Sequence, residues 1–278
     1  MDYQKPVSRA NPGLVVFVLD DSASMGDPLP GTSDPKYVWV ERYTKVLLSE
    51  LLARSQEKGA GDTIRIKPRY FVYFVIYGGK PVTSWNAQDP HQLDIQSVLT
   101  KYAASNYSLG LGGKLSGTDA RAAFAEVRQF LARVISQFQQ CFPPMVFHLT
   151  DGESATDAED VAGELSRLTT TDGAPLIVNA FLGASTELNY AGPDDFPGYL
   201  SEADAGPSEY GQRLFRMSSV VPSTIRANLV SDGIFPAIRP GARLFFDVRT
   251  KDMLKHTIQV VGSQGSRAGY TLRASSEV

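Results

Sequence analysis

Short apolar runs and longer amphipathic stretches alternate along the chain. The apolar runs are rich in Val, Ile and Phe, which favours strands, whereas the longer stretches place apolar residues three and four positions apart, which favours helices with one buried face. This alternation is typical of parallel strands joined by crossover helices. Strands are expected at Leu14 to Leu19, Tyr70 to Tyr77, Met145 to Leu149, Leu176 to Leu182 and Arg243 to Val248.

Helices are expected between these strands. The first follows Ser33-Asp34-Pro35, which offers a cap residue and a proline for the first turn, and it continues to about Gln56. The clearest helical spacing belongs to Asp119 to about Gln140. Thr156 or Asp157 can cap the next helix. The other helices are expected at Leu93 to Tyr102, at Tyr210 to Met217, at Ser223 to Val230 and through Leu254, Ile258 and Val261.

The predicted architecture is an α/β, doubly wound sheet. Lys80 to Trp85 is expected to return antiparallel to the second strand, which gives a mostly parallel, six-stranded sheet with one antiparallel edge strand and helices on both faces. Without an internal repeat or a clear linker, residues 12–262 are interpreted as one domain between tails at 1–11 and 263–278. The irregular segment 183–207 is long enough to suggest a functional or mobile loop.

Composition narrows the possible partners and the compartment. Hydrophobic residues make up 42% and charged residues 21% of the chain, as in ordinary globular proteins. The net charge of -3 and the absence of a Lys or Arg run argue against binding to nucleic acid or to an anionic membrane. Cys141 is the single cysteine, and no signal or membrane anchor is visible, so a cytoplasmic location is expected.

Oxygen-bearing side chains gather where the predicted strands end. The first strand runs into Asp20, Ser22 and Ser24, while Thr118 opens a helix and Asp151 follows a later strand. Because ligands collect beyond the carboxyl ends of parallel strands, we expect these side chains at one edge of the sheet. Carboxylates and hydroxyls suit a small hard cation. The sequence therefore predicts an Mg²⁺ site, with Mn²⁺ or Ca²⁺ as alternatives.

The five positions resemble the metal-ion-dependent adhesion site of von Willebrand factor A (vWA) and integrin I domains. In that family a hydrophobic strand ends in Asp-x-Ser-x-Ser, a distant Thr follows, and an Asp-Gly pair ends a later strand. Asp20, Ser22, Ser24, Thr118 and Asp151 match all five positions, and the likeness extends over roughly residues 12–262. The resemblance implies a Rossmann-like vWA fold, contact of Asp151 with the metal through water, and a partner protein whose Glu or Asp completes the metal shell.

A plainer interpretation makes these residues structural. Ser22 and Ser24 are common turn residues, and Asp151-Gly152 is a common strand-ending turn. Asp21 and Asp119 suit solvent-facing or capping positions better than ligand positions. His148 lies within a strand pattern and is expected to be packed or hydrogen-bonded rather than catalytic.

Enzymes that use paired acids are the rival class. Asp20-Asp21 after the first strand resembles a response-regulator receiver, but Tyr70 to Tyr77 ends in Gly78-Gly79 where a receiver needs its phosphoacceptor Asp. A haloacid-dehalogenase phosphatase needs a second Asp where Ser22 stands, to act as acid and base. We therefore predict a binding module without catalysis and keep metal-dependent phosphotransfer as the alternative.

In size and layout the chain resembles intracellular bacterial vWA proteins of the TerY type. In that group the domain is commonly encoded beside a PP2C-like phosphatase and a Ser/Thr kinase. The resemblance implies a regulatory scaffold in a stress or defence system, with one of those enzymes as the partner that supplies the acidic side chain. An adhesion-type or chelatase-associated vWA protein is the alternative.

Overall fold

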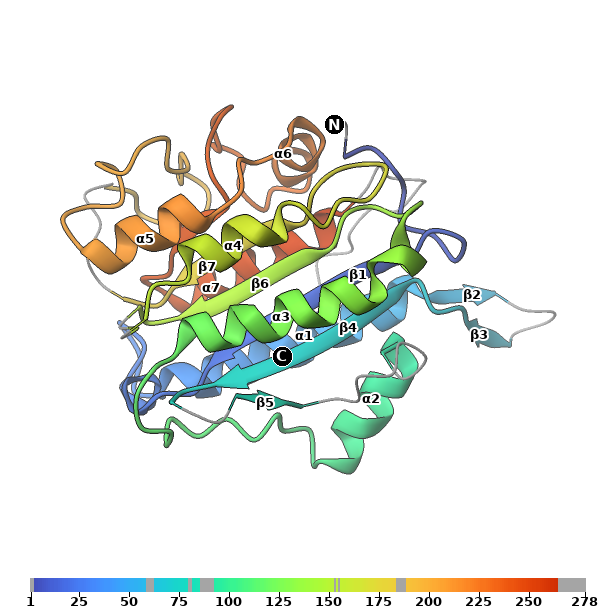
Figure 1. Ribbon diagram of the computed structural model, residues 1–278, viewed down its shortest axis with the longest axis horizontal. Coiled ribbons are helices and arrows are strands. Elements are labelled where there is room, and N and C mark those ends of the chain that lie inside the picture. Colours follow the sequence, from blue (N-terminus) through green and yellow to red (C-terminus); the bar gives the residue numbers. More distant parts are fainter. Residues whose placement is uncertain are drawn as a thin grey trace.

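The computed structural model describes residues 3–58, 63–79, 82–85, 93–152, 154, 156–183 and 189–264. The strands of its main sheet are β1 (Gly13–Asp20), β4 (Tyr70–Tyr77), β5 (Thr83–Ser84), β6 (Met145–Thr150), β7 (Leu176–Phe181) and β8 (Phe245–Asp247). They form a six-stranded sheet in the order β5-β4-β1-β6-β7-β8 (Figure 1). The pairs β1–β4, β1–β6, β6–β7 and β7–β8 are parallel, and β5 pairs antiparallel to β4.

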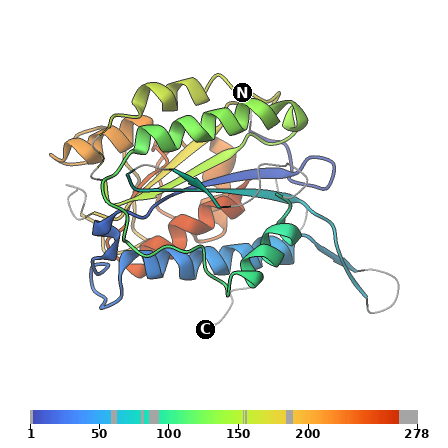
Figure 2. The same ribbon diagram turned by 60° about the horizontal axis from the view of Figure 1, so that its bottom comes forward.

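Helices cover both faces of this sheet. They are α1 (Lys36–Arg54), α2 (Ile95–Ala104), α3 (Ala120–Val134), α4 (Glu159–Leu165), α5 (Glu209–Met217), α6 (Ser223–Ser231) and α7 (Lys251–Gln259). Figure 2 shows α3 and α4 on one side of the sheet and α1 and α7 on the other. Within the described ranges, no helix has the length and apolar character to cross a membrane.

Burial of the central strands on both faces accounts for their largely apolar sequence. All eight residues of β1 and all six residues of β6 are buried. Alternate β1 side chains enter the two cores, with Phe17 on the α1 side and Val16 and Val18 on the α3 side. The α/β class, the antiparallel edge strand and the two helical layers predicted from the sequence are confirmed.

The starts of two helices differ from the sequence prediction. Pro35 is the N-cap of α1 and Ala158 that of α4, and neither gives a side-chain cap. Of the two residues expected to cap α4, Asp157 accepts from the backbone N–H of Glu159 at 2.8 Å, whereas Thr156 donates its hydroxyl to Asp119 Oδ1 at 2.9 Å. Thr156 is therefore engaged with the start of α3. Asp119 itself caps α3 by accepting from a backbone N–H of the first turn, as predicted.

Two regions were not foreseen in their observed form. The antiparallel hairpin of β2 (Gln56–Lys58) and β3 (Ile64–Ile66) was not predicted, because β2 has no apolar residue and β3 alternates over only three residues. In the irregular segment, the described residues 189–207 include Phe196 and Tyr199, which are fully buried and pack against each other. The part of that segment around Phe196 and Tyr199 therefore belongs to the core. Residues 184–188, Lys80 and residues 265–278 of the predicted tail lie outside the described residues.

Candidate functional site

The turn after β1 holds three of the five predicted ligands. Asp20 ends the strand and is fully buried. Its Oδ1 accepts from the backbone N–H of Ser22 at 2.9 Å, and its Oδ2 accepts from the hydroxyl of Thr150 at 2.6 Å. The hydroxyls of Ser22 and Ser24 lie 3.2 Å apart. One turn thus presents a carboxylate and two neighbouring hydroxyls at the carboxyl end of β1.

Asp151 lies at the end of the neighbouring strand. It directly follows β6, and its side chain is 5% exposed. Oδ2 lies 3.0 Å from Nζ of Lys36, which also donates to the backbone oxygen of Ser24 at 3.2 Å. Oδ1 is buried and has no hydrogen-bond partner within the described chain. The negative charge of Asp151 also acts on Asp20, as expected for two carboxylates at one edge of the sheet.

Thr118 is brought to this edge by the segment between α2 and α3. It is buried, and its backbone oxygen accepts from the hydroxyl of Ser154, three residues after Asp151, at 3.3 Å. Three residues before Thr118, the backbone N–H of Leu115 donates to the carbonyl of Asp21 at 3.2 Å. The segment that carries Thr118 is therefore held between the turn after β1 and the loop after β6.

Asp21 corrects a sequence expectation. It neither faces solvent nor caps a helix, because it is buried and its Oδ1 accepts from the backbone N–H groups of Gly112 and Gly113, each at 2.7 Å. Gly113 has a φ of +58°, and a Cβ there would lie 2.5 Å from the backbone nitrogen of Gly26. Such a close approach admits glycine only. Asp21 thus fixes the glycine-rich loop against the turn after β1.

The electrostatics of the edge favour a cation. Burial raises the pKa of the Asp20 carboxyl to about 6, although hydrogen bonds from Thr150 and Ser22 lower it, and the charge of Asp151 raises it further. A buried carboxylate with a raised pKa gains when a positive charge arrives, because the cation stabilises the ionised form. Asp151 already has one positive charge beside it, the ammonium of Lys36.

The donor set fits a hard divalent cation rather than a soft metal. Among the described residues, no group of three or more His, Cys, Asp and Glu side chains could hold a metal. The candidate ligands are instead two carboxylates with hydroxyls, the oxygen donors that Mg²⁺ accepts together with water. Oδ1 of Asp151 is a buried acceptor that lacks a partner, and a cation or a cation-bound water would satisfy it.

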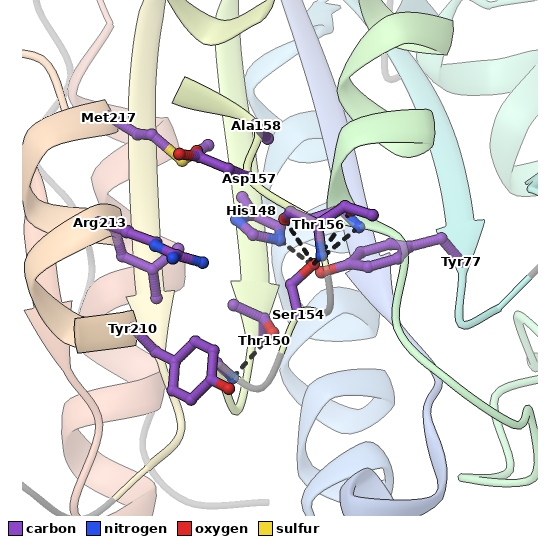
Figure 3. Close-up of a pocket in the computed structure, with 13 residues that line it drawn as sticks. Tyr77, His148, Thr150, Ser154, Thr156, Asp157, Ala158, Tyr210, Arg213 and Met217 are labelled. Atoms are coloured by element: carbon purple, nitrogen blue, oxygen red, sulfur yellow. Dashed lines mark hydrogen bonds between the residues drawn. The ribbon is translucent and has the colours of Figure 1, made fainter. Parts of the chain in front are cut away.

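A small pocket adjoins the site on the side of α5. It reaches Thr150 and Gly152, the residues on either side of Asp151. Figure 3 shows Tyr210, Arg213 and Met217 of α5 facing the loop after β6 across this pocket. Its lining comprises Tyr77, Ala120, His148, Thr150, Gly152, Ser154, Thr156, Asp157, Ala158, Tyr210, Arg213, Leu214 and Met217.

His148 lies at the floor of this pocket in a closed hydrogen-bond network. Its Nε2 is 2.6 Å from the hydroxyl of Tyr77, and its Nδ1 is 2.8 Å from Oδ1 of Asn179. Since the Asn179 amide nitrogen donates to Leu214 and Ser218, its oxygen must accept from His148 Nδ1–H, and Tyr77 then donates to Nε2. Burial lowers the pKa of His148 to about 4, so the ring is neutral at pH 7. The packed, hydrogen-bonded role predicted for His148 is confirmed.

Sequence reasoning missed two contacts at this edge. Thr150 was not singled out, although a hydroxyl at the end of β6 stands beside the end of β1 once the two strands pair. Lys36 was also overlooked. A signal was present, because Lys36 is the first residue of α1, where the helix dipole disfavours a cation. A lysine at that position indicates a contact outside its own helix, which here is the contact with Asp151.

Comparisons with known proteins find likeness in structure but none in sequence. Neither a family model nor a curated protein sequence matches the chain. Among solved structures, a crystal structure of the SpRpn10 VWA domain aligns with a TM-score of 0.38 and 9% identity, over 61% of this chain and 76% of that chain. A likeness of this size carries no argument about function, so the argument for function rests on the site itself.

Proposed function

We propose that the chain is a vWA-type module that binds a partner protein through a metal ion. In this proposal Asp20, Ser22, Ser24, Thr118 and Asp151 hold Mg²⁺, and a Glu or Asp of the partner completes the shell. The main support is the buried, unpartnered Oδ1 of Asp151 at the edge where the hydroxyls of the β1 turn gather.

The chemistry of the ligands supports an acidic guest. Two carboxylates balance the two charges of the metal, and hydroxyls add coordination without adding negative charge. The loaded metal therefore stays electrophilic and accepts another anionic oxygen. Mn²⁺ and Ca²⁺ are the alternative cations, and Mn²⁺ is the convenient spectroscopic probe.

The direct test is a metal titration of the wild type and matched variants. We expect Mn²⁺ binding by calorimetry in the wild type and a loss of more than about a hundredfold in affinity in Asp20→Ala and Asp151→Ala. Asp195→Ala is the control, because it removes a carboxylate that accepts the backbone N–H groups of Ala191 and Gly192 in an exposed loop. Equal affinity in all four chains, with unchanged circular dichroism, would rule out this metal site.

The finer part of the proposal is a cytoplasmic regulatory scaffold in a bacterial stress or defence system. A PP2C-like phosphatase or a Ser/Thr kinase is the proposed partner, as the likeness to TerY-type proteins implies. Capture of such an enzyme in Mg²⁺, with release by EDTA and no capture by Asp20→Ala, is the expected result. If neither EDTA nor Asp20→Ala changes the capture, the partner binds independently of the metal site.

The enzymatic alternative is a phosphotransfer site built on Asp20 and Asp21. Against it stands the geometry of Asp21, whose Oδ1 is committed to two backbone N–H groups. We therefore propose a non-catalytic module. Metal-dependent turnover of a generic phosphodonor such as acetyl phosphate, abolished in Asp20→Asn, would reverse this assignment.

A further inference from the structure

Lys36 joins two of the segments that form the candidate metal site. Its Nζ lies 3.0 Å from Oδ2 of Asp151 and donates to the backbone oxygen of Ser24 at 3.2 Å. Its backbone N–H donates to the carbonyl of Asp27 at 3.0 Å, which anchors the start of α1 beside the turn after β1. A single ammonium thus connects the β1 turn with the end of β6.

This ion pair is less exposed than most others among the described residues. The Lys36 and Asp151 side chains are 12% and 5% exposed, whereas those of Arg121 and Asp160 are 48% and 60% exposed. Water therefore screens the Lys36 charge weakly, and its field acts strongly on neighbouring groups. The lysine also stands at the positive end of α1, whose first turn has no acidic residue. The helix gains nothing from this cation.

The charges at the site make the effect on metal binding predictable. Asp20 and Asp151 with the Lys36 ammonium carry a net charge of minus one. A divalent cation would bring this group to plus one, and it would also compete with the ammonium for Asp151. Metal binding to the free chain is then opposed by Lys36. A carboxylate that arrives with the metal restores neutrality.

On the basis of the proposed function, we propose that Lys36 is a built-in counter-cation that makes metal loading depend on the acidic ligand. The free domain binds the divalent cation weakly, and a carboxylate guest and the cation strengthen each other's binding. By thermodynamic linkage the two enhancement factors are equal. Lys36 thereby favours a metal site that fills when an acidic partner is present.

The test measures Mn²⁺ affinity with and without acetate, which serves as the carboxylate probe. In the wild type, we expect saturating acetate to raise Mn²⁺ affinity by about tenfold or more. In Lys36→Met, Mn²⁺ should bind at least about tenfold more tightly without acetate, and the gain from acetate should shrink to about twofold or less. Electron paramagnetic resonance of free Mn²⁺ reports both constants.

Two further variants keep the result interpretable. Lys36→Arg retains the charge and should keep weak metal binding and a large acetate effect. Lys45→Met removes the same charge from the same helix, where the ammonium lies 4.7 Å from the ring centre of Tyr107, and should behave as the wild type. Circular dichroism confirms that each variant is folded.

The outcomes separate this inference from the proposed function. If Asp20→Ala abolishes Mn²⁺ binding while Lys36→Met binds Mn²⁺ no more tightly than the wild type, the role of Lys36 is overturned and the metal site stands. If neither the wild type nor Lys36→Met binds Mn²⁺, with or without acetate, both proposals are overturned. Tighter binding in Lys36→Met together with a lost acetate effect supports both.

Discussion

Two buried polar clusters differ in how completely their groups are paired, one around His148 on β6 and one around Asp151, which directly follows that strand. Around His148, both ring nitrogens have partners in Tyr77 and Asn179, and the Asn179 amide donates twice more. Around Asp151, one carboxylate oxygen is held by Lys36 and the other has no partner within the described residues. Strand β6 therefore carries one completed network, and the residue that follows it carries one open acceptor.

The difference indicates two different uses of buried polarity. A fully paired network stabilises one arrangement of the core, since breaking it leaves several groups desolvated and unbonded. An unpaired buried acceptor costs stability unless a ligand satisfies it, and a ligand that binds only the folded chain stabilises it. The His148 cluster is expected to serve the fold, and the Asp151 cluster is expected to serve binding.

The largest expected effect breaks the completed cluster. His148→Leu leaves the hydroxyl of Tyr77 and the amide oxygen of Asn179 without their partner, so we expect a loss of about 3 kcal/mol in the free energy of unfolding at pH 7. Urea denaturation followed by circular dichroism measures this. His256→Leu is the control, because Nδ1 of His256 bonds the Asp252 carbonyl of its own helix and the ring lies beside Phe235, and it should change stability by less than about 1 kcal/mol. Equal losses in the two variants would contradict the distinction.

A pH series on the same variant tests the neutral state of His148. Burial lowers the pKa of His148 to about 4, against about 6.5 in the unfolded chain. Between these values the unfolded chain binds the extra proton, so the wild type loses up to about 3 kcal/mol as the pH falls from 6.5 to 4. The stability advantage over His148→Leu should therefore vanish near pH 4. The raised pKa of Asp20 stabilises the folded chain as the pH falls, but it does so equally in the wild type and in His148→Leu. A difference in unfolding free energy between these two chains that stays constant with pH would disprove the neutral state of His148.

The candidate ligands could be predicted from the sequence because each stands at the end of a recognisable element. Asp20 ends and Asp151 follows a largely apolar strand, and the parallel topology then dictates which strand ends share an edge. The strong helical spacing after Asp119 located the start of α3. Local pattern was sufficient wherever one face of an element had to be buried.

What the sequence did not reveal depends on contacts between distant segments. Lys36 meets Asp151 across 115 residues, and Asp21 bonds backbone N–H groups of a loop 91 and 92 residues away. A backbone N–H leaves no mark in the residue type, so the burial of Asp21 could not be foreseen. Phe196 and Tyr199 are buried in an irregular segment, where no periodicity marks the buried face.

A smaller effect is expected where the binding cluster depends on its supporting loop. Asp21→Ala removes the acceptor of the Gly112 and Gly113 N–H groups, so we expect about 1–2 kcal/mol lower stability and about tenfold weaker Mn²⁺ binding, since the loop leads to Thr118. Asp204→Ala is the matched control, because its carboxylate accepts two N–H groups of a different loop. It should leave Mn²⁺ affinity unchanged. Equal Mn²⁺ affinity in Asp21→Ala and the wild type would disconnect this loop from the site.

The smallest effect is expected at Thr150, which lies between the two clusters. Its hydroxyl donates to Oδ2 of Asp20 at 2.6 Å and accepts from the backbone N–H of Gly152 at 3.0 Å. Thr150→Val keeps the shape but loses these bonds, so we expect about 1 kcal/mol lower stability and about fivefold weaker Mn²⁺ binding.

The pH behaviour of this variant decides whether the clusters are independent. If they are, the effect of His148→Leu on the free energy of unfolding should change between pH 6.5 and 4 by the same amount in the Thr150→Val background as in the wild type. Thr150→Ser retains the hydroxyl and should bind Mn²⁺ within about twofold of the wild type. A loss of Mn²⁺ affinity in Thr150→Ser as large as in Thr150→Val would assign the effect to packing rather than to the hydrogen bond. If Thr150→Val alters how much stability is lost between pH 6.5 and 4, the two clusters form one connected unit, in which protonation of His148 changes the energy of Asp20.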